Sequence, residues 1–291
     1  MLNTIFAQII FESKINDSAA KKLENLMKLS SNENYSPSFD EYKKARLVVD
    51  KKYLTCNNCA YFKKSKKCDH CNTETAENYF TIFDLKDQIK NIVRENWSSL
   101  MYYKKNITKL GYLPESFIAK FHEKHDGLTL TLNLDGISVF KNNSKDTWPV
   151  YLAFNELKMD AKFDIKNIAL AGIWCGQTKI NNQLLLEKLM EKVKQLESGV
   201  EIDGALIKIY VVFGSYDKPA KSLIYNCQTC TSINGCMFCD ACCTRIGRKP
   251  VYLSSGKQRK HGSQIENAKK AFETGKPVLG MKGLSSLRYY F

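Results

Sequence analysis

The sequence contains no long apolar run. No stretch approaches the roughly 18 consecutive apolar residues that a membrane-spanning helix needs. The N-terminal segment MLNTIFAQIIFESK also lacks the basic lead and the small-residue cleavage site of a secretory signal. No internal repeat of solenoid length occurs. We therefore expect a soluble intracellular protein without a membrane partner, whose core is built from the 44% of its residues that are apolar.

Acidic residues are few compared with basic ones. The chain has 44 Lys and Arg against 30 Asp and Glu, which gives a net charge of +14. Residues 41–71 carry nine basic and three acidic side chains, residues 244–291 carry eleven and two, and the remainder is about neutral. Two cationic surfaces indicate a polyanionic partner, either nucleic acid or an anionic membrane face. The competing interpretation is a lysine-rich surface that only solvates the protein.

The most regular patterning lies between residues 128 and 243. LTLTLNLD predicts a half-buried strand, ISVF with WPVYLAFNEL predicts a second strand, and NIALAGIWCG predicts a buried third strand. QLLLEKLMEKVKQLES then predicts a helix that Gly199 closes. ALIKIYVVFGSYD predicts a fourth strand, central because it is nearly all apolar and parallel to its neighbour because a helix precedes it. We expect an α/β fold with a mixed sheet, and Pro149 at the start or edge of its strand.

An aspartate follows the first of these strands, and another follows the fourth. Because functional groups gather at the carboxyl ends of parallel strands, we expect Asp135 and Asp217 to lie near each other. Paired carboxylates bind hard cations such as Mg²⁺ or Mn²⁺, which activate an attacking oxygen and stabilise a leaving oxygen in phosphodiester cleavage. The alternative is two turns, because Asp135-Gly136 is a hairpin signal and YDKP is a turn signal.

The cysteines fall into two groups. The first group contains Cys56, Cys59, Cys68 and Cys71. Its C-x2-C-x8-C-x2-C spacing predicts a structural, tetrahedral Zn²⁺ site, and four unrelated buried cysteines are the alternative. The loop AYFKKSKK places Tyr61 and Phe62 beside four lysines, which suits phosphate contact and base stacking if the ribbon is not purely structural. We expect His70 to be a bystander, although it can replace one cysteine.

Five further segments resemble motifs of CACTA-type eukaryotic DNA transposases, of the CMC superfamily, and of their domesticated relatives. They are DGISVFKNNSKDTWPVYLAFNEL, NIALAGIWCG, VVFGSYDKPAKSLIYN, GCMFC and GMKGLSSL. The segments occur in the family's order and at comparable separations, so that the resemblance covers roughly residues 50 to 291. The first and third are the most specific, since neither is a generic turn or helix cap.

The resemblance implies a ribonuclease-H-like fold in which Asp135 and Asp217 are the first two catalytic aspartates. It implies metal-dependent DNA cleavage and strand transfer with Mg²⁺ or Mn²⁺, double-stranded DNA with the transposon's terminal inverted repeats as the partner, and a nuclear location. We also expect self-association. The alternatives are a catalytically inactive zinc-containing DNA-binding or scaffold protein derived from a transposase, and an RNA-binding zinc protein.

The sequence departs from the family near its end. In similar proteins, GMKGLSSL is followed by an Asp-x-Met-His motif and by a long helical region that supplies the third acidic residue, whereas this chain ends at Phe291. Glu266 and Glu273 are the nearby acidic candidates, and neither corresponds to that third ligand. We therefore expect a C-terminally truncated transposase, either a fragment, a truncated gene copy or a domesticated DNA-binding remnant, and its enzyme activity stays open.

The second cysteine group is larger than one zinc ion needs. It contains Cys227, Cys230, Cys236, Cys239, Cys242 and Cys243. Cys236 and Cys239 match the family's cysteine pair, so we expect them to bind a second structural Zn²⁺. We expect Cys227 and Cys230 to complete the site, although the five-residue loop between the pairs is tight. His261 competes for one place, because RKH falls where relatives carry an Arg-x-His string.

Three other cysteines have no metal role in this scheme. Cys242 and Cys243 are unassigned, because adjacent cysteines rarely bind one ion together, and Cys175 in an apolar strand is expected in the core. The expected division of the chain is a helical hairpin in residues 1–35, a basic zinc ribbon in 36–80, a helical connector in 81–126, a partial ribonuclease-H-like core in 127–225, and a Cys-rich zinc loop with a basic C-terminal segment in 226–291.

Overall fold

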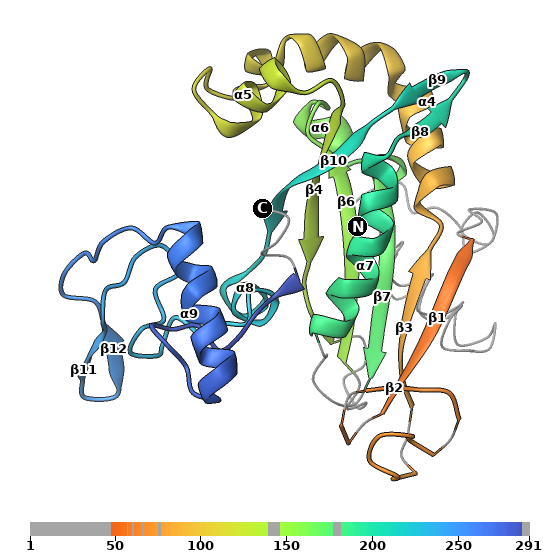
Figure 1. Cartoon of the computed structure of the whole chain (residues 1–291). Helices are drawn as coiled ribbons and strands as arrows, with labels where there is room; N and C mark the ends of the chain where they lie inside the picture. Colours follow the sequence, from red (N-terminus) through yellow and green to blue (C-terminus); the bar gives the residue numbers. More distant parts are fainter. Residues whose placement is uncertain are drawn as a thin grey trace, which may run out of the picture.

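A mixed sheet forms the centre of the computed structural model, which describes residues 48–286 except residues 57, 60, 66, 75–76, 139–145 and 177–181 (Figure 1). Its strand order is β10-β4-β6-β7-β3-β1-β2, and β5 also pairs with β6. The strands are β1 (Val49–Cys56), β2 (Phe62–Lys63), β3 (Glu77–Phe83), β4 (Leu128–Leu134), β5 (Ile137–Ser138), β6 (Asp146–Phe154), β7 (Ile168–Gly176) and β10 (Ile209–Ser215). The expected mixed α/β class is confirmed. The hairpin expected in residues 1–35 lies outside the described residues.

The first predicted strand is β4. Its four leucines are at most 1% exposed and form part of the main core. Thr129 on its other face is also buried, because the Thr129 N–H and hydroxyl both donate to the Glu156 carboxylate, at 2.9 and 2.6 Å. The strand is less buried toward its carboxyl end, where Asn133 is half-buried. The strand is therefore closed on both faces at its start and accessible where it ends.

Helices connect the strands and cover them. They are α4 (Leu85–Lys105), η1 (Ile107–Leu110), α5 (Phe117–Lys124), α6 (Met159–Lys162), η2 (Ile165–Asn167), α7 (Asn182–Glu197), α8 (Lys218–Ile224) and α9 (His261–Thr274). α7 lies along one face of the sheet, in front of β6 and β7 (Figure 1). Gly199, at φ +111°, follows its end as expected. No described helix is long and apolar enough to cross a bilayer.

β10 lies at the edge of the sheet, where it pairs with β4, so the expectation of a central fourth strand is wrong. Its expected parallel pairing is confirmed. A helix covers its apolar side chains: the rings of Phe213 and Phe117 lie 5.9 Å apart between centroids, and those of Tyr210 and Phe121 lie 5.2 Å apart. Ile209 and Val211 are buried in the main core with α7, so helices rather than a strand on either side bury the apolar run. A small hairpin precedes it, formed by β8 (Val200–Ile202) and β9 (Ala205–Ile207).

The expected zinc ribbon extends the central sheet. β3 pairs antiparallel with β7, where Tyr79 stands opposite Cys175, and β1 pairs with β3. Cys175 is 6% exposed, as predicted for a core residue. The expected boundary between residues 80 and 81 falls inside β3. The ribbon is thus connected to the core by main-chain hydrogen bonds of one sheet.

Residues 225–286, here named the C-terminal module, lie beside the end of β10 (Figure 1). The module contains α9 and a short hairpin of β11 (Thr244–Ile246) and β12 (Lys249–Val251). Its buried apolar cluster consists of Cys227, Ala268 and Met281. The Arg259 guanidinium connects its loops by donating to the carbonyls of Asn234, Cys236, Cys239 and Leu279. Hydrogen bonds to one central arginine therefore replace much of a hydrophobic core.

Candidate functional site

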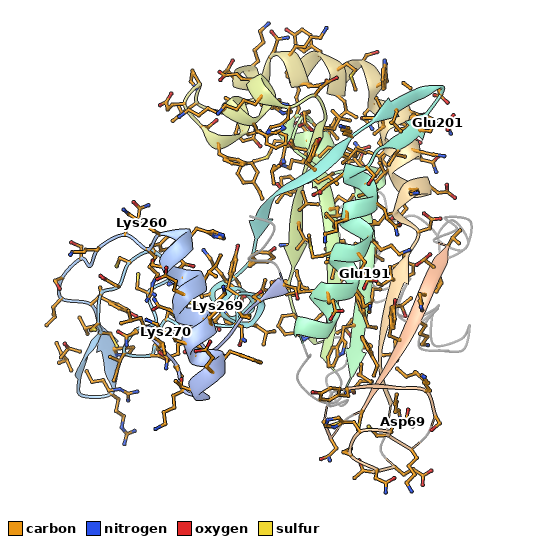
Figure 2. All side chains as sticks on the ribbon, viewed as in Figure 1. Asp69, Glu191, Glu201, Lys260, Lys269 and Lys270 are labelled. Carbon is orange, nitrogen blue, oxygen red and sulfur yellow. The ribbon has the colours of Figure 1, made fainter. Side chains whose placement is uncertain are left out.

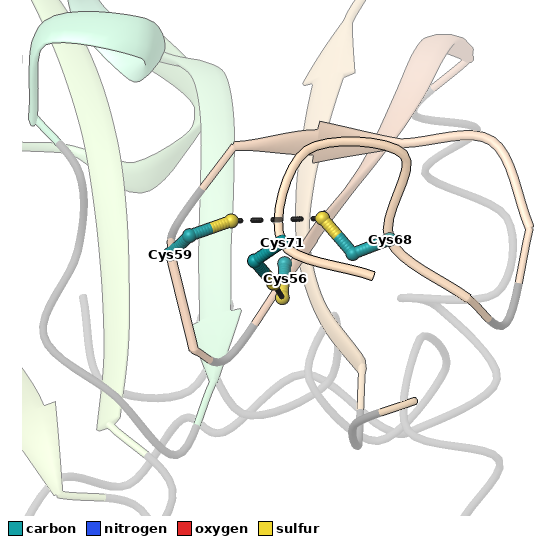
Figure 3. Close-up of side chains that lie close together, drawn as sticks. All are labelled: Cys56, Cys59, Cys68 and Cys71. Carbon is teal, nitrogen blue, oxygen red and sulfur yellow. Dashed lines mark hydrogen bonds between the residues drawn. The ribbon is translucent and has the colours of Figure 1, made fainter. Parts of the chain in front are cut away.

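Four thiols converge where the ribbon leaves the sheet (Figure 3). They belong to Cys56, Cys59, Cys68 and Cys71, whose sulfur atoms all lie within 4.8 Å of one another. The Sγ atoms of Cys56 and Cys71 are 3.6 Å apart, and those of Cys59 and Cys68 are 3.5 Å apart. A tetrahedral zinc ion with Zn–S distances of about 2.3 Å sets its sulfur ligands ~3.8 Å apart. The predicted grouping is confirmed, and the four cysteines can hold a metal ion such as zinc.

Two tight turns position these thiols. In the first turn, the Asn58 N–H donates to Cys56 Sγ at 3.4 Å, and the Cys56 N–H donates to the Tyr61 carbonyl at 2.9 Å. In the second turn, the N–H of Asn72, a residue at φ +60°, donates to the Cys68 carbonyl at 2.9 Å. The C-x2-C spacing predicts such turns, because they bring both sulfurs of a pair to the same side.

Crowding shifts the acidity of the thiols. Desolvation raises the pKa of Cys59 to about 12, and hydrogen bonds with the other three thiols add to the rise. The Thr73 hydroxyl, 2.8 Å from Cys71 Sγ, lowers the pKa of Cys71 together with the Thr73 N–H. A divalent cation stabilises thiolates and so removes the cost of packing four sulfurs together. Because four protein ligands leave no position for water, a metal ion held by all four thiols would be structural rather than catalytic.

The loop between the two cysteine pairs offers fewer cations than expected. Lys63 is only 4% exposed, so it is not available to a phosphate. The exposed lysines among the loop residues described are Lys64 and Lys67. Tyr61 stacks on His70 with ring centroids 3.8 Å apart, and His70 lies outside the metal-ligand group. His70 therefore is the bystander that was expected.

The second cysteine group does not converge in the same way. Within the described part of the chain, no second set of three ligand atoms lies within 4.8 Å. The Sγ atoms of Cys236 and Cys239 are 3.4 Å apart. Cys227 is buried and packs against α9, and Cys230 is half-buried. The structure brings together the expected pair, Cys236 and Cys239, and does not close the expected set of four.

The Cys242 and Cys243 thiols have different surroundings, and His261 lines one cavity together with Cys227 and Cys236. The Cys242 thiol is exposed and donates to Asn234 Oδ1 at 3.0 Å. The Cys243 thiol is buried and donates to the Ser232 carbonyl at 3.3 Å. His261 is exposed and begins α9. The two adjacent cysteines therefore point to different surroundings, one outward and one into the module.

Asp135 lies in an interruption between two strand segments. β4 and β5 both pair with β6, and the register of β5 continues that of β4 without a shift. Asp135 therefore stands opposite Pro149, which lies inside β6 instead of at its start and has no N–H for the ladder. A Cβ on Gly136 would lie 2.7 Å from the Trp148 ring, so only glycine fits there. The hairpin interpretation of Asp135-Gly136 is wrong.

Asp217 follows β10 at the same edge of the sheet. Ser215 stands opposite Asn133 in the parallel register, and Asn133 Nδ2 donates to the Ser215 carbonyl at 2.8 Å. Asp135 and Asp217 each lie two residues beyond this last pair, Asp217 at the start of α8 (Figure 1). Asp217 Oδ1 also accepts the Ala220 N–H at 2.6 Å and so caps α8. YDKP is therefore the start of a helix rather than an isolated turn.

The aspartate pair has no third ligand among the residues that the structure describes. Both carboxylates are exposed, and neither belongs to a group of three side chains that could hold a metal. Glu266 and Glu273 occupy exposed positions of α9 and do not join them. The pair offers oxygen ligands to a hard cation without forming a complete coordination shell.

The C-terminal module carries many exposed cations. They are Arg245, Arg248, Lys249, Lys257, Lys260, Lys269, Lys270, Lys276 and Lys282. None of them forms an ion pair with another described residue. Figure 2 shows Lys260, Lys269 and Lys270 on or beside α9, whereas Glu191 and Glu201 lie on α7 and β8. The positive charge that the sequence places near the C-terminus is thus not neutralised by the fold.

Sequence reasoning missed two polar groups that organise the molecule. His122 Nε2 lies 2.9 Å from Glu156 Oε1, the oxygen that also accepts the Thr129 N–H of β4. The two side chains are 6% and 0% exposed. Arg259 fixes the loops of the C-terminal module, although its sequence context RKH suggests a surface cation. Neither residue carries a local signal of burial, because its partners lie far away in the sequence.

These features define a mixed α/β protein with four cysteines that could hold a metal ion and with exposed aspartates after two neighbouring strands of its sheet. The chain belongs to the family described as "Protein of unknown function (DUF1258)", whose model matches residues 41–275. The matched residues include both cysteine groups and both aspartates. No curated protein matches the chain. The description of this family names no activity, so the function is argued from the residues of this chain.

Proposed function

We propose that the chain is a transposase-derived DNA-binding protein of the DDE/DDD type, in which Asp135 and Asp217 bind a divalent cation. One observation carries the proposal. β10 and β4 are adjacent parallel strands, and Asp217 and Asp135 each follow the last pair of their register by two residues. This is the end of the strands at which open α/β sheets bind their ligands. The strand order supports a shared site for the two aspartates, which are far apart in the sequence.

The order of the strands supports a ribonuclease-H-like class. β4, β6 and β7 are antiparallel neighbours in chain order, and the chain then passes through α7 to β10, which is parallel to β4. This agrees with the expected sequence of three strands, one helix and one strand, with an aspartate after the first strand and after the fourth. β3 and β1 continue the sheet beyond β7 and are additional to that arrangement.

Carboxylate chemistry supports Mg²⁺ or Mn²⁺ as the cation. Hard divalent cations prefer oxygen ligands. Asp217 uses Oδ1 to cap α8, so its second oxygen can face a cation. A bound cation would activate the attacking oxygen and stabilise the leaving oxygen of a phosphodiester. The contribution of the chain itself is to place two carboxylates after neighbouring strands at an exposed edge.

The charge of the C-terminal module supports DNA as the partner. Its exposed arginines and lysines have no described carboxylate partners, and such cations bind phosphates with release of counterions. The module follows α8 and therefore starts a few residues after Asp217. In this proposal the target is double-stranded DNA of transposon terminal repeats in the nucleus, with self-association as a further interaction.

A second candidate function rests on the coordination shell. Because no third ligand joins Asp135 and Asp217 among the described residues, two carboxylates are a weak cation site. This favours a catalytically inactive zinc-containing DNA-binding or scaffold protein derived from a transposase. Both candidates share the four-cysteine group and the cationic module. They differ in whether DNA is cut.

A nicking assay with aspartate variants tests the two candidates. Asp217→Asn keeps a good helix cap for α8 while removing the charge, and Asp135→Asn makes the same change on β4. Supercoiled DNA and terminal-repeat DNA are incubated with the protein and Mg²⁺ or Mn²⁺. We expect divalent-dependent nicking that both variants lose, with DNA affinity largely unchanged. Glu201→Gln, an exposed carboxylate on β8, is the matched control.

The outcomes separate the candidates. Nicking that survives in both aspartate variants contradicts the proposed cation site. DNA binding without nicking in any divalent metal supports the inactive derivative. Absence of salt-dependent DNA binding contradicts both, since the cationic module then has another purpose.

A further inference from the structure

A cavity lies between α8 and the start of α9. Its volume is about 250 Å³, and its walls include Lys221 of α8, Gln264 of α9, and Gln228 and Asn234 of the chain between these helices. Pockets that hold drug-sized ligands measure roughly 300 to 1,000 Å³. This cavity therefore suits a smaller group, such as a single nucleotide.

Two cysteines and a histidine in the wall of this cavity do not form a metal centre. They are Cys227, Cys236 and His261. Among the described residues, no three possible ligand atoms of this region lie within 4.8 Å of one another. Cys227 also packs in the apolar cluster with Ala268 and Met281. The chemistry of the cavity therefore depends on its charged, amide and thioether side chains.

The cavity carries positive charge without a carboxylate to balance it. Lys221 and Arg259 line it, and no described Asp or Glu does. Neither cation forms an ion pair with another described residue. The Arg259 guanidinium donates to four carbonyl oxygens, which are neutral groups and leave its charge uncompensated. Two half-buried cations attract an anion, and guanidinium and ammonium groups both bind phosphate.

The remaining side chains of the wall suit the base of a nucleotide. Gln228, Asn234 and Gln264 carry amides that both donate and accept hydrogen bonds, as the edge of a base requires. Met237 and Met281 carry polarizable thioethers that pack against flat rings. Pockets for an unpaired base combine apolar side chains with hydrogen-bonding groups at the base edge. Phosphate and base thus have partners in the same cavity.

An exposed aromatic ring lies beside the cavity. Phe238 is 73% exposed, and Lys221 Nζ lies 4.6 Å from its ring centroid. A ring of this kind offers a stacking surface to a neighbouring unpaired base. Lys221 also follows Asp217 by one helical turn, since the Lys221 N–H donates to the Asp217 carbonyl at 2.8 Å. The cavity therefore begins one turn of α8 away from a proposed cation ligand.

We propose that this cavity receives one unpaired nucleotide of a DNA strand, while Phe238 stacks on the next base. The phosphate of the nucleotide binds Lys221 and faces the charge of Arg259, and its base contacts the Gln228 amide. The inference rests on the proposed function, because it takes DNA as the partner. It adds that the duplex is bound with an unpaired nucleotide near the aspartates. A fully paired duplex supplies such a nucleotide only when a base leaves the stack.

Binding to two forms of DNA tests the inference. The full chain is titrated into a labelled blunt duplex and into the same duplex with a short single-stranded extension, without added divalent cations. Fluorescence anisotropy gives both affinities. We expect the wild type to bind the extended DNA about tenfold more tightly, because base stacking and a phosphate contact are added. Gln228→Ala and Phe238→Ala should each lose most of this preference and keep the affinity for the blunt duplex.

Matched changes outside the cavity serve as controls. Gln258→Ala removes an exposed amide of the same module, and Lys218→Gln removes an exposed cation of α8. Both variants should keep the preference for extended DNA, whereas Lys221→Gln should lose it. If Lys218→Gln loses as much of the preference as Lys221→Gln, general charge explains it and the cavity assignment is overturned.

Competition on the wild-type chain keeps the test valid where a variant does not fold. Thymidine monophosphate should displace the extended DNA at concentrations at which inorganic phosphate and thymidine do not. Equal displacement by inorganic phosphate means an anion site only and overturns the inference. Equal affinity of the wild type for extended and blunt DNA overturns it as well and leaves the proposed function intact. Absence of binding to both DNAs contradicts the proposed function itself.

Discussion

The two cysteine groups share the C-x2-C spacing, yet they differ in how far the fold closes them. In the first group, the four sulfurs lie within 4.8 Å of one another. The antiparallel pairing of β1 with β2 and the bridge between Lys67 and Glu74 fold the chain back on itself, so that the two cysteine pairs lie together. In the second group, the Sγ atoms of Cys236 and Cys239 are 3.4 Å apart, and the surrounding loop consists of turns and bends. Strand pairing positions the four thiols of the first group without a metal ion, whereas the loops of the second group bring no third described thiol to the Cys236–Cys239 pair.

The largest effect is expected at the first group. Cys68→Ser removes a ligand that is 1% exposed, and we expect loss of the metal and of the ribbon's fold, by at least ~3 kcal/mol or about 10 °C in melting temperature. Metal content and thermal unfolding measure it. Cys175→Ala, a buried cysteine of β7 outside the group, is the control and should keep the metal. Equal losses in both variants would mean that burial rather than metal binding explains the group.

A smaller, local effect is expected from replacing Arg259 in the C-terminal module. Arg259→Lys keeps the charge but cannot reach the carbonyls of Asn234, Cys236 and Leu279 at once, which costs roughly 2 to 3 kcal/mol of local stability. Hydrogen exchange should rise in residues 226–286 and stay unchanged in β4, β6 and β7. Arg245→Lys, an exposed matched change, should have no effect. Faster exchange throughout the sheet would contradict a local role.

The two regions should also differ in DNA binding. The double change Lys269→Gln and Lys270→Gln removes two exposed cations of α9, and we expect the slope of log affinity against log salt to fall by about 2. Fluorescence anisotropy at several salt concentrations measures this slope. The matched pair Lys51→Gln and Lys52→Gln lies near the first group, and we expect a smaller change. If the Lys51 and Lys52 variant lowers the salt slope more than the Lys269 and Lys270 variant does, the DNA-binding surface lies on the ribbon rather than on the C-terminal module.

The smallest effect concerns the hydroxyl beside one thiol of the first group. Thr73→Val removes the donor that lowers the pKa of Cys71. The Cys71 pKa then rises, protons compete better with the metal, and the midpoint of metal release on acidification moves to higher pH, with about 10-fold weaker binding near neutrality. A chromophoric chelator in a pH series reports it. Thr73→Ser keeps the hydroxyl and should behave as the wild type.

Local periodicity predicted much of the fold. The alternation in LTLTLNLD predicted β4, and the apolar run NIALAGIWCG predicted β7. The position of β10 in the sheet was not predictable in this way. Ile209 and Val211 lie in the main core, to which α7 contributes, and the rings that cover Phe213 and Tyr210 come from α5, far upstream. Burial by a strand and burial by a helix leave the same pattern in a sequence.

Spacing predicted the first cysteine group, whereas the pair in the second group was expected from the family resemblance. C-x2-C spacing also fits Cys227 with Cys230 and Cys239 with Cys242, so spacing alone does not single out Cys236 and Cys239, whose Sγ atoms are 3.4 Å apart. Spacing gives no information on the packing of Cys227 against Met281, which lies more than fifty residues later in the chain. The same limit applies to the aspartates. Their positions after two strands were predictable, whereas the parallel pairing that makes their strands neighbours is a property of the sheet.

The proline in β6 has a mechanical consequence for the edge of the sheet. Because the ladder is interrupted opposite Pro149, the peptide units around Asp135 have no cross-strand bonds to break when they move. The flanking segments β4 and β5 stay paired with β6, so the interruption is confined to two residues, and Asp135 is one of them.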